Sequence, residues 1–566
     1  MAIDRGAWHA GPVLAITWAA ALAVRGAGAA QEPVPTVTLD RELTAVRQKL
    51  AALVDDDDLV DSLYFGWFDR PYRRATLACA LKTAAVLERE LRLRRAGNGA
   101  LSDSQVRDLI AWTDAAVARA CRPAERAGLL PHRISVGLDG AAARGGLPVA
   151  LFGFVDRATS TRLDDWHGDL DLLASCGFRV YARCARPYIA SQAWQSLRGH
   201  APALGMSVAV VESAKREAPS AGMPLRVRTA TLRELFEFDP VADARTDATV
   251  AVVEPAGGEG WGESFARRGL YRGVTSRTVS VVCGWAVPGA EPDRAASAEQ
   301  ARAAMWAHVC DGQQLGLIEG WRDLRDGSLS PHASVAVAPG FVEAVAHAGL
   351  DILHHREALR RFGADRRLLL LVDASAIDAD EPNRWANGFA VVARALHTRQ
   401  IQFDVLPRRF ANDQRRLADY ELAIDVHTPT DEDAPRITPG DVYRRGVAVD
   451  EPPTVGESFV QWVSRLLDAS AGGLRVRVLA PDGHLEKHVH ARCVRGEGGT
   501  LRLALINLRP HARRVVPSLG PGWSLGRAVD LINSTRLSNL SQGVNLAAWQ
   551  VRLFTVDGKG PARTAR

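Results

Sequence analysis

The chain has 566 residues, of which 47% are hydrophobic and 24% are charged, and its formal net charge is +5. This balance is typical of folded globular proteins and excludes a disordered or fibrous chain. The chain is too long for one ordinary core, so we expect two to four domains. Because its few excess positive charges are spread among interleaved acidic and basic residues, the sequence gives no indication of nucleic-acid binding.

The first 30 residues differ in character from the rest of the chain. One arginine precedes the apolar run 11–24, and small residues follow the run. This pattern predicts that residues 1–30 form an export signal cleaved near Ala29 or Ala30, since the run is shorter than the roughly 20 residues of a membrane span. An uncleaved N-terminal anchor and a wrongly chosen start codon are the alternatives. We therefore expect an exported protein, periplasmic or extracellular, with no membrane association after cleavage.

Seven cysteines are scattered along the chain without a CxxC pair. Their spacing disfavours a zinc site and a dense disulfide framework. We expect neither a metal nor a cofactor. In an exported protein one or two bridges can form, and nearness in sequence favours Cys79–Cys121 and Cys176–Cys184. The odd number leaves at least one thiol free.

The pattern of apolar residues changes twice along the chain. Residues 40–130 have helical spacing, and a Ser-Asp-Ser sequence at 102–104 marks a helix start. In residues 131–350, short apolar runs alternate with amphipathic stretches, which is typical of a parallel sheet covered by helices on both faces. Eight runs are candidate strands: 133–138, 148–156, 178–184, 206–213, 225–230, 249–254, 278–285 and 315–321.

Eight such strands predict a (β/α)8 TIM barrel, and connections too short for a helix predict that it is irregular or incomplete. A doubly wound open sheet is the competing architecture. No GxGxxG opens a helix after the first strand and no GxxxxGK[ST] occurs, so a nucleotide-binding fold has little support. Residues 355–465 alternate strands and helices and predict a flavodoxin-like α/β domain. Residues 472–556 have a period of two and predict a C-terminal antiparallel β-sandwich.

Several segments resemble scaffold elements of family 42 glycoside hydrolases, the β-galactosidase type. "WHGDLDLLASCGFRVYARCARPYI" at 166–189 is similar to that family's first barrel helix and second strand. "AAMWAHVCDGQQLGLIEGWRDLRDGSLSPHASV" at 303–335 is similar to its last helix and strand. Stretches within 366–424 and 501–556 resemble its middle domain and its terminal sandwich. The resemblance implies a TIM barrel, catalysis by two glutamates, and a homo-oligomer formed through the flavodoxin-like domain.

The catalytic positions depart from the family pattern. In the family, the acid/base glutamate follows an asparagine at the end of strand four, and the nucleophile ends strand seven. The barrel segment of this chain has no Asn-Glu pair, and its candidate seventh strand carries Cys283 and Trp285 but no carboxylate. A nucleophilic Cys283 would need a histidine base, for which the sequence offers no signature.

Four carboxylates end or closely follow apolar runs: Asp156, Glu212, Glu254 and Glu319. In a barrel these positions converge on one mouth, and glycosidases need two carboxylates about 5–9.5 Å apart. We predict Glu254 as the acid/base and Glu319 as its catalytic partner. The alternative for each is a structural ion pair with an arginine, such as Arg322 beside Glu319.

Further residues near these strand ends are predicted to bind substrate. Tryptophan rings stack on the apolar faces of sugars, although a single tryptophan more often serves packing. The substrate-binding candidates are Glu259, Trp261, Trp285, Trp321, Arg322 and Asp156. The Gly-rich loop after Glu254 is expected to let Glu259, Trp261 and Glu263 fold over the barrel mouth. It is not expected to bind phosphate, because its acidic residues repel anions. His484, His488 and His490 are predicted to lie on a solvated strand face and not to bind a metal.

The sequence therefore predicts an exported glycoside hydrolase that acts on β-linked sugars, with carbohydrate as its ligand. A non-catalytic carbohydrate-binding or scaffold protein on a decayed glycosidase barrel is the alternative.

Overall fold

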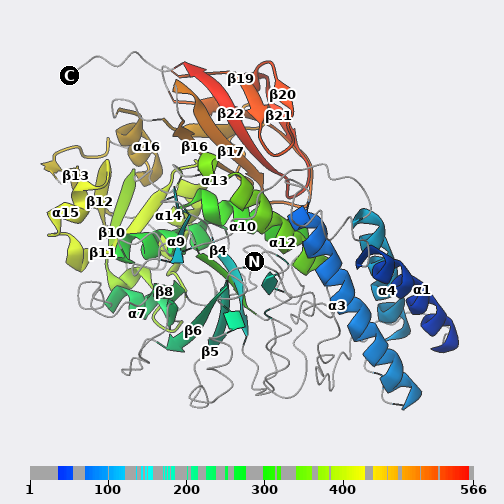
Figure 1. The fold of residues 1–566 in the computed structure, drawn as a ribbon. Coiled ribbons are helices and arrows are strands. Elements are labelled where there is room, and N and C mark those ends of the chain that lie inside the picture. The colour runs from blue at the N-terminus through cyan, green and yellow to red at the C-terminus, as the bar shows by residue number, and fades with distance from the viewer. Residues whose placement is uncertain are drawn as a thin grey trace.

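The computed structural model describes residues 36–559 with gaps (Figure 1). The longest stretches outside the described residues are 55–69, 121–134, 157–169, 185–199, 214–224, 238–248, 253–260, 276–297, 320–338 and 428–437. The predicted export signal also lies outside them. Among the described helices, none combines the length and the hydrophobicity of a membrane span.

Three helices form the N-terminal part of the described chain: α1 (Thr36–Val54), α3 (Arg70–Arg95) and α4 (Asp103–Ala120). They share a core of leucine, valine and alanine side chains, in which Leu87 and Val106 are fully buried. The predicted helix start at Ser102 is confirmed. Ser102 Oγ accepts a hydrogen bond from the Gln105 backbone N–H, and Gln105 Oε1 accepts one from the Ser102 N–H. This reciprocal pair is a capping box, which satisfies backbone donors that a helix start leaves free.

Six parallel strands form one sheet: β4 (Leu151–Asp156), β5 (Val180–Cys184), β6 (Ser207–Ser213), β7 (Leu225–Ala230), β8 (Thr249–Val252) and β9 (Leu315–Glu319). Their order is β8-β7-β6-β5-β4-β9, so the last strand in sequence pairs with the first. The helices connecting or following these strands are α7 (Leu232–Glu237), α9 (Trp261–Thr275), α10 (Ala298–Cys310), α12 (Pro339–His354) and α13 (Arg356–Leu359). Six of the eight predicted strands are therefore confirmed as members of one parallel sheet.

The first candidate strand, 133–138, was predicted wrongly. Its described part, β1 (Ser135–Val136), pairs antiparallel with β2 (Ala142–Arg144), which pairs with β3 (Leu147–Pro148). A short apolar run beside two Gly-containing turns closes more readily as a local hairpin than as a long-range parallel strand. The candidate strand 278–285 lies outside the described residues.

A second, mixed sheet contains β10 (Leu368–Val372), β11 (Phe403–Pro407), β12 (Leu422–His427), β13 (Thr438–Arg444) and β14 (Val447–Val449). Its order is β11-β10-β12-β13-β14, with the first three strands parallel and the last two antiparallel. The order of the parallel strands is that of a flavodoxin-like sheet. The elements around it are α14 (Asn387–Thr398), α15 (Gln414–Ala418), α16 (Phe459–Ala469), η5 (Ala374–Ala376) and η6 (Arg408–Phe410).

Helix α9 joins the two sheets. Two glycines one turn apart let its backbone rest directly on strand β11: a Cβ at Gly269 would lie 2.6 Å from the Phe403 carbonyl oxygen, and one at Gly273 would lie 2.1 Å from that of Val405. Leu270, between them, is buried in the core of the second sheet. Helix α9, which follows strand β8 of the parallel sheet, thus also covers one face of the second, mixed sheet.

Two antiparallel sheets make up the C-terminal part, drawn in orange and red in Figure 1. The three-stranded sheet is β15 (Val476–Leu479), β18 (Arg513–Leu519) and β21 (Val544–Leu546), and the five-stranded sheet is β16 (Val489–Arg495), β17 (Leu501–Asn507), β22 (Val551–Lys559), β19 (Ser524–Asp530) and β20 (Arg536–Leu537), with η8 (Leu540–Gln542) between strands.

Strand β17 shows how this part is attached to the rest. Leu501, Leu503 and Leu505 belong to a core shared by the two antiparallel sheets. Ala504 and Ile506, on the opposite face, belong to the core that includes helices α10 and α12. A strand buried on both faces reads as a continuous apolar run, as "LRLALIN" does.

Candidate active site at the carboxyl edge of the parallel sheet

The carboxyl ends of the six parallel strands lie at one edge of their sheet, where open and closed α/β sheets bind ligands. The last residues of the strands are Asp156, Cys184, Ser213, Ala230, Val252 and Glu319. Strands β4 and β9 are neighbours, and Val155 is in register with Glu319. The structure therefore places two of the predicted site residues, Asp156 and Glu319, at adjacent backbone positions.

The two positions fall on opposite faces of the sheet. Residues in register share a face, and successive residues of a strand alternate between faces, so 319 shares its face with 155 and not with 156. Phe152 identifies the other face: its ring is buried against helix α12, where a Cβ at Gly349 would lie 3.7 Å from Phe152 Cδ2. Positions 152, 154 and 156 are therefore on the helix-covered face, and Glu319 is on the opposite one.

Following the register across the sheet adds two polar residues to the face of Glu319. Val155 is in register with Ala182, which is in register with Ala209. Four residues further along β6, position 213 is on the same face, and Ser213 is in register with Thr229 of β7. Ser213 and Thr229 were not among the predicted site residues. Counting alternate positions back from the strand ends would have identified these two residues, but only if the pairing register of the strands were known.

The helix-covered face carries charges of both signs in register. Asp156 is in register with Arg183, and Glu212 with Arg228. Opposite charges at neighbouring positions stabilise a sheet. Position 319, by contrast, is in register with the apolar residue Val155 of β4.

The remaining predicted residues of the site are mostly outside the described part of the chain. These are Glu254, Glu259, Trp285, Trp321 and Arg322. Trp261 is the first residue of α9. Its half-buried ring stacks on that of Phe265, one turn further along, with centroids 6.0 Å apart and planes at 30°. The ring of Trp261 is thus held by packing at the start of a helix.

Glu263 does not follow the expectation that the loop's acids fold over the mouth. It lies inside the first turn of α9, and its Oε1 is 3.4 Å from Arg394 Nε of helix α14. Its backbone carbonyl accepts a hydrogen bond from Trp385 Nε1 at 3.1 Å. A helical start at Trp261 turns this residue toward the second sheet, so that part of the prediction is wrong.

The densest group of buried polar side chains lies away from this edge, where α9, α10 and β16 meet. Asp311, directly after α10, has Oδ1 at 2.7 Å from Arg492 Nη2 and at 3.2 Å from His490 Nε2. Its Oδ2 is 3.5 Å from Arg268 Nη1 of α9. We call these four residues the junction cluster. All four side chains are almost completely buried.

Aromatic rings complete the surroundings of the junction cluster. Phe265 stacks on His490 at 4.3 Å and on His397 of α14 at 4.5 Å, with interplanar angles of 12° and 24°. The Arg268 guanidinium carbon lies 4.2 Å from the centre of the Phe265 ring, within the range of cation–π attraction. The cluster therefore ties three parts of the fold together around one phenyl ring.

The protonation states of the cluster follow from its burial. Burial alone would raise the pKa of Asp311, but the positive charge of Arg492, with further favourable interactions from His490 and Arg268, holds it well below its usual value. Burial, with repulsion from Arg492, lowers the pKa of His490 to about 4 despite the nearby carboxylate. Burial and the neighbouring His490 and Arg492 likewise lower the pKa of His397 well below its usual value. At neutral pH the cluster is one carboxylate between two guanidiniums, with neutral imidazoles.

The prediction of a solvated strand face is wrong for His490, which is fully buried in β16. His484 is exposed and His488 is half-buried, and both precede the strand. Within the described residues, no three His, Cys, Asp or Glu side chains gather in a way that could hold a metal ion. A fully closed cluster cannot admit a sugar, so we assign the junction cluster to the stability of the fold.

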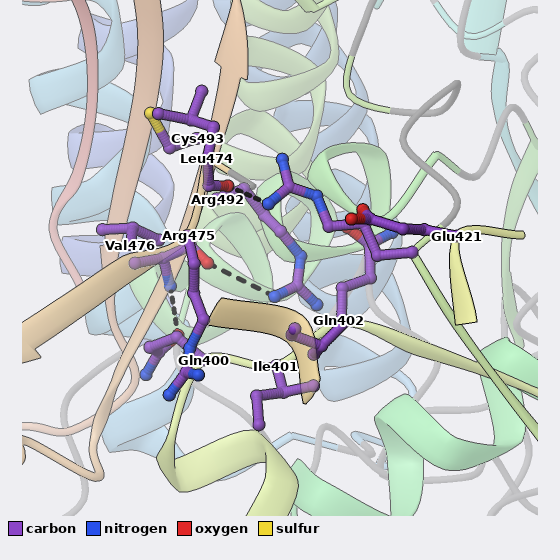
Figure 2. Close-up of a pocket in the computed structure, with 12 residues that line it drawn as sticks. Gln400, Ile401, Gln402, Glu421, Leu474, Arg475, Val476, Arg492 and Cys493 are labelled. Carbon is purple, nitrogen blue, oxygen red and sulfur yellow. Dashed lines mark hydrogen bonds between the residues drawn. The ribbon is translucent and has the colours of Figure 1, made fainter. Parts of the chain in front are cut away.

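A small cavity lies next to the cluster, at the amino ends of β10, β11 and β12 and facing β15 and β16 (Figure 2). Arg367, Gln400, Glu421, Arg475 and Arg492 provide its polar lining. The Gln400 side chain spans the gap, donating to the Val489 carbonyl at 2.5 Å and accepting from the Ala491 N–H at 2.7 Å. The cavity volume is about 30 Å³, room for one or two water molecules but far below the roughly 300–1,000 Å³ of ligand pockets. We do not assign it a ligand.

Comparison with known proteins bears on the fold. No protein-family model matches the sequence, and no characterised protein sequence matches it significantly. Among solved structures, a family 42 exo-carrageenase from Bacteroides ovatus aligns with 93% of this chain and 100% of its own, with a TM-score of 0.53 and 9% sequence identity. The chain shares its fold with a family 42 glycoside hydrolase. The resemblance inferred from the scaffold segments is thereby confirmed for the fold.

Two further glycosidases align more loosely. A family 27 β-L-arabinopyranosidase from Geobacillus stearothermophilus covers 74% of this chain and 98% of its own, with a TM-score of 0.28. An α-galactosidase I from Mortierella vinacea covers 72% and 96%, with a TM-score of 0.25; both are 9% identical to this chain. TM-scores this low do not establish a shared fold. At 9% identity the family 42 likeness itself does not identify the reacting residues.

Proposed function

We propose that this chain is an exported glycoside hydrolase on a TIM-barrel-type scaffold that acts on β-linked sugars at the carboxyl edge of its parallel sheet. The observation that carries the proposal is the likeness in fold to a family 42 exo-carrageenase, which covers 93% of this chain and 100% of that protein. A likeness of fold supports a reaction class only together with a suitable site. The position of Glu319 supplies part of that site.

The strand order supports a barrel over the competing open sheet. Strands β4 to β8 are neighbours in sequence order, and β9, the last, returns to pair with β4. Sequential order with the last strand beside the first is the arrangement of a (β/α)8 barrel, whereas a doubly wound sheet reverses its order near the middle. On this proposal the face of Glu319, Ser213 and Thr229 is the inside of the barrel.

The proposed chemistry uses two carboxylates. Glu319 acts as the nucleophile or ionised base at the end of the last strand, and Glu254, two residues beyond β8 in sequence, acts as the acid. A retaining enzyme holds the two carboxyl groups about 5–5.5 Å apart and an inverting one about 6.5–9.5 Å apart.

The proposal is tested by assaying the purified chain against aryl β-glycosides and carrageenan oligosaccharides, since the structural neighbour is an exo-carrageenase. Hydrolysis that is lost in both Glu254→Gln and Glu319→Gln, with unchanged thermal midpoints, is the expected result. Activity that survives in both variants would contradict the two-carboxylate assignment.

A second candidate function is carbohydrate binding without catalysis. It is favoured by the absence of an Asn-Glu pair between residues 131 and 350 and of a carboxylate in residues 278–285. A glycan array distinguishes the two: retention of a sugar with no hydrolysis supports the binding protein, and release of product supports the enzyme. Neither binding nor hydrolysis of any glycan would contradict both.

A further inference from the structure

Two cysteine thiols face each other between the N-terminal helices and the parallel-sheet region. Cys79 lies in the middle of helix α3, and Cys176 lies in the segment that leads into strand β5. Their Sγ atoms are 3.6 Å apart, and each residue is 1% exposed. The pairs favoured by nearness in sequence, Cys79–Cys121 and Cys176–Cys184, therefore do not describe this arrangement.

The surroundings of the pair are apolar and contain one competing hydrogen-bond acceptor. Cys176 Sγ lies 3.8 Å from the Ala75 carbonyl oxygen, one turn before Cys79 on the same helix. Both cysteines belong to the core that also contains Phe178 and Tyr181. A disulfide needs sulfur atoms about 2.05 Å apart, so the two thiols must approach by roughly 1.5 Å to form one.

We propose that Cys79 and Cys176 form a disulfide bond that fastens helix α3 to the parallel-sheet region. The oxidant is a disulfide compound, either a low-molecular-weight disulfide or an oxidoreductase. One cysteine thiolate attacks that disulfide, forming a mixed disulfide and releasing one thiol. The second cysteine thiolate then displaces the other half as a second thiol. Two protein thiols are oxidised, one external disulfide is reduced, and the protein thiol protons end on the two released thiols.

The burial of the pair determines when the bond can form. Thiolate is the reacting species, and the hydrogen bond that the Cys79 thiol shares with Cys176, together with burial, raises the pKa of the Cys79 thiol well above its usual value. The folded pair is thus both inaccessible and protonated. The bond forms while the chain folds, before α3 docks, and once formed it closes a loop between residues 97 positions apart in sequence.

The test uses the full chain, unfolded with reductant and refolded with a mixture of reduced and oxidised glutathione. A non-reduced digest analysed by mass spectrometry is expected to contain one linked peptide that joins the segments of Cys79 and Cys176. The same linked peptide should persist in Cys310→Ser, whose thiol is equally buried, at the end of α10. In Cys79→Ser, Cys176 should be alkylated after denaturation.

Alkylation of both Cys79 and Cys176 in the oxidatively refolded wild-type chain would overturn the proposal. A digest that joins either residue to another cysteine would overturn it as well. The peptide map of the wild-type chain is sufficient to test the proposal. The proposal therefore stays testable even if a serine variant fails to fold. The outcome is also independent of whether the chain hydrolyses a sugar.

Discussion

Asp311 and Arg492, 181 residues apart in sequence, form a buried ion pair with a shortest N–O distance of 2.7 Å. Asp311 directly follows helix α10, which leads into the last parallel strand, and Arg492 lies in the middle of β16. The pair therefore fixes the five-stranded antiparallel sheet against the helices around the parallel sheet. Arg268 of α9 approaches the same carboxylate from the other side.

Replacing Asp311 by Asn should destabilise the chain strongly, because it leaves the guanidiniums of Arg268 and Arg492 buried without their carboxylate. Breaking one side of a buried ion pair costs roughly 3–5 kcal/mol. Chemical denaturation followed by circular dichroism measures the loss. Glu381→Gln is the control: Glu381 and its partner Arg384 have side chains 58% and 56% exposed, and removing such a pair costs less than about 1 kcal/mol. Equal losses in the two variants would contradict the central role of Asp311.

His490 should make stability depend on pH between about 4 and 6.5. Its folded-state pKa is lowered to about 4 by burial and by Arg492, against a usual 6.5. Between these values the unfolded chain binds the proton and the folded chain does not, so stability is lost as the pH falls, by up to roughly 3 kcal/mol.

The variant His490→Gln tests this dependence. Unfolding free energies measured from pH 7 to pH 4 should fall less steeply in His490→Gln than in the wild-type chain. His511→Gln, which changes an exposed histidine, should keep the wild-type slope. If the slope of His490→Gln equals that of the wild type, the imidazole is not held neutral by the junction cluster.

The contact between α9 and β11 should not tolerate a side chain. In Gly273→Ala the new Cβ would lie 2.1 Å from the Val405 carbonyl oxygen, a backbone atom, so the helix must move away from the strand. Such overpacking costs about 1–3 kcal/mol. Gly388→Ala, in α14 with open space around its position, should instead be neutral or stabilising by up to about 1 kcal/mol. The thermal midpoint should therefore fall clearly in Gly273→Ala and stay level or rise in Gly388→Ala. An unchanged midpoint in Gly273→Ala would contradict the close approach of α9 to β11.

The sequence predicted those elements whose signal is local. The apolar run "LLLLV" became strand β10, the period-two stretch "VHARCVR" became strand β16, and the capping residues Ser102 and Gln105 began helix α4. Strand β14, which is short and mostly exposed, was missed because its local pattern is weak. Helix α16 was missed although its apolar residues have helical spacing.

The contacts between distant parts of the chain could not be predicted from the sequence. Nothing near Asp311 indicates Arg492, and the period-two pattern around His490 does not tell which face is covered by another part of the fold. The same holds for Cys79 and Cys176, since each lies nearer in sequence to another cysteine. The position of Glu319 at a strand end could be predicted, but the face of the sheet on which it lies follows only from its register with Val155.

The face of Glu319 leads to a sharp comparison with Asp156, the acidic residue that ends the neighbouring strand. On the proposed function, Glu319→Gln should lower the turnover of an aryl glycoside by on the order of 10²–10⁴-fold, the range for loss of a catalytic acid or base. Asp156 lies on the helix-covered face in register with Arg183, so Asp156→Asn should keep turnover within about tenfold while lowering the thermal midpoint. Turnover and thermal midpoints of the two variants, measured side by side, distinguish a catalytic role of Glu319 from a structural role of Asp156. If Asp156→Asn abolishes turnover and Glu319→Gln does not, the inner face of the sheet has been assigned the wrong way round.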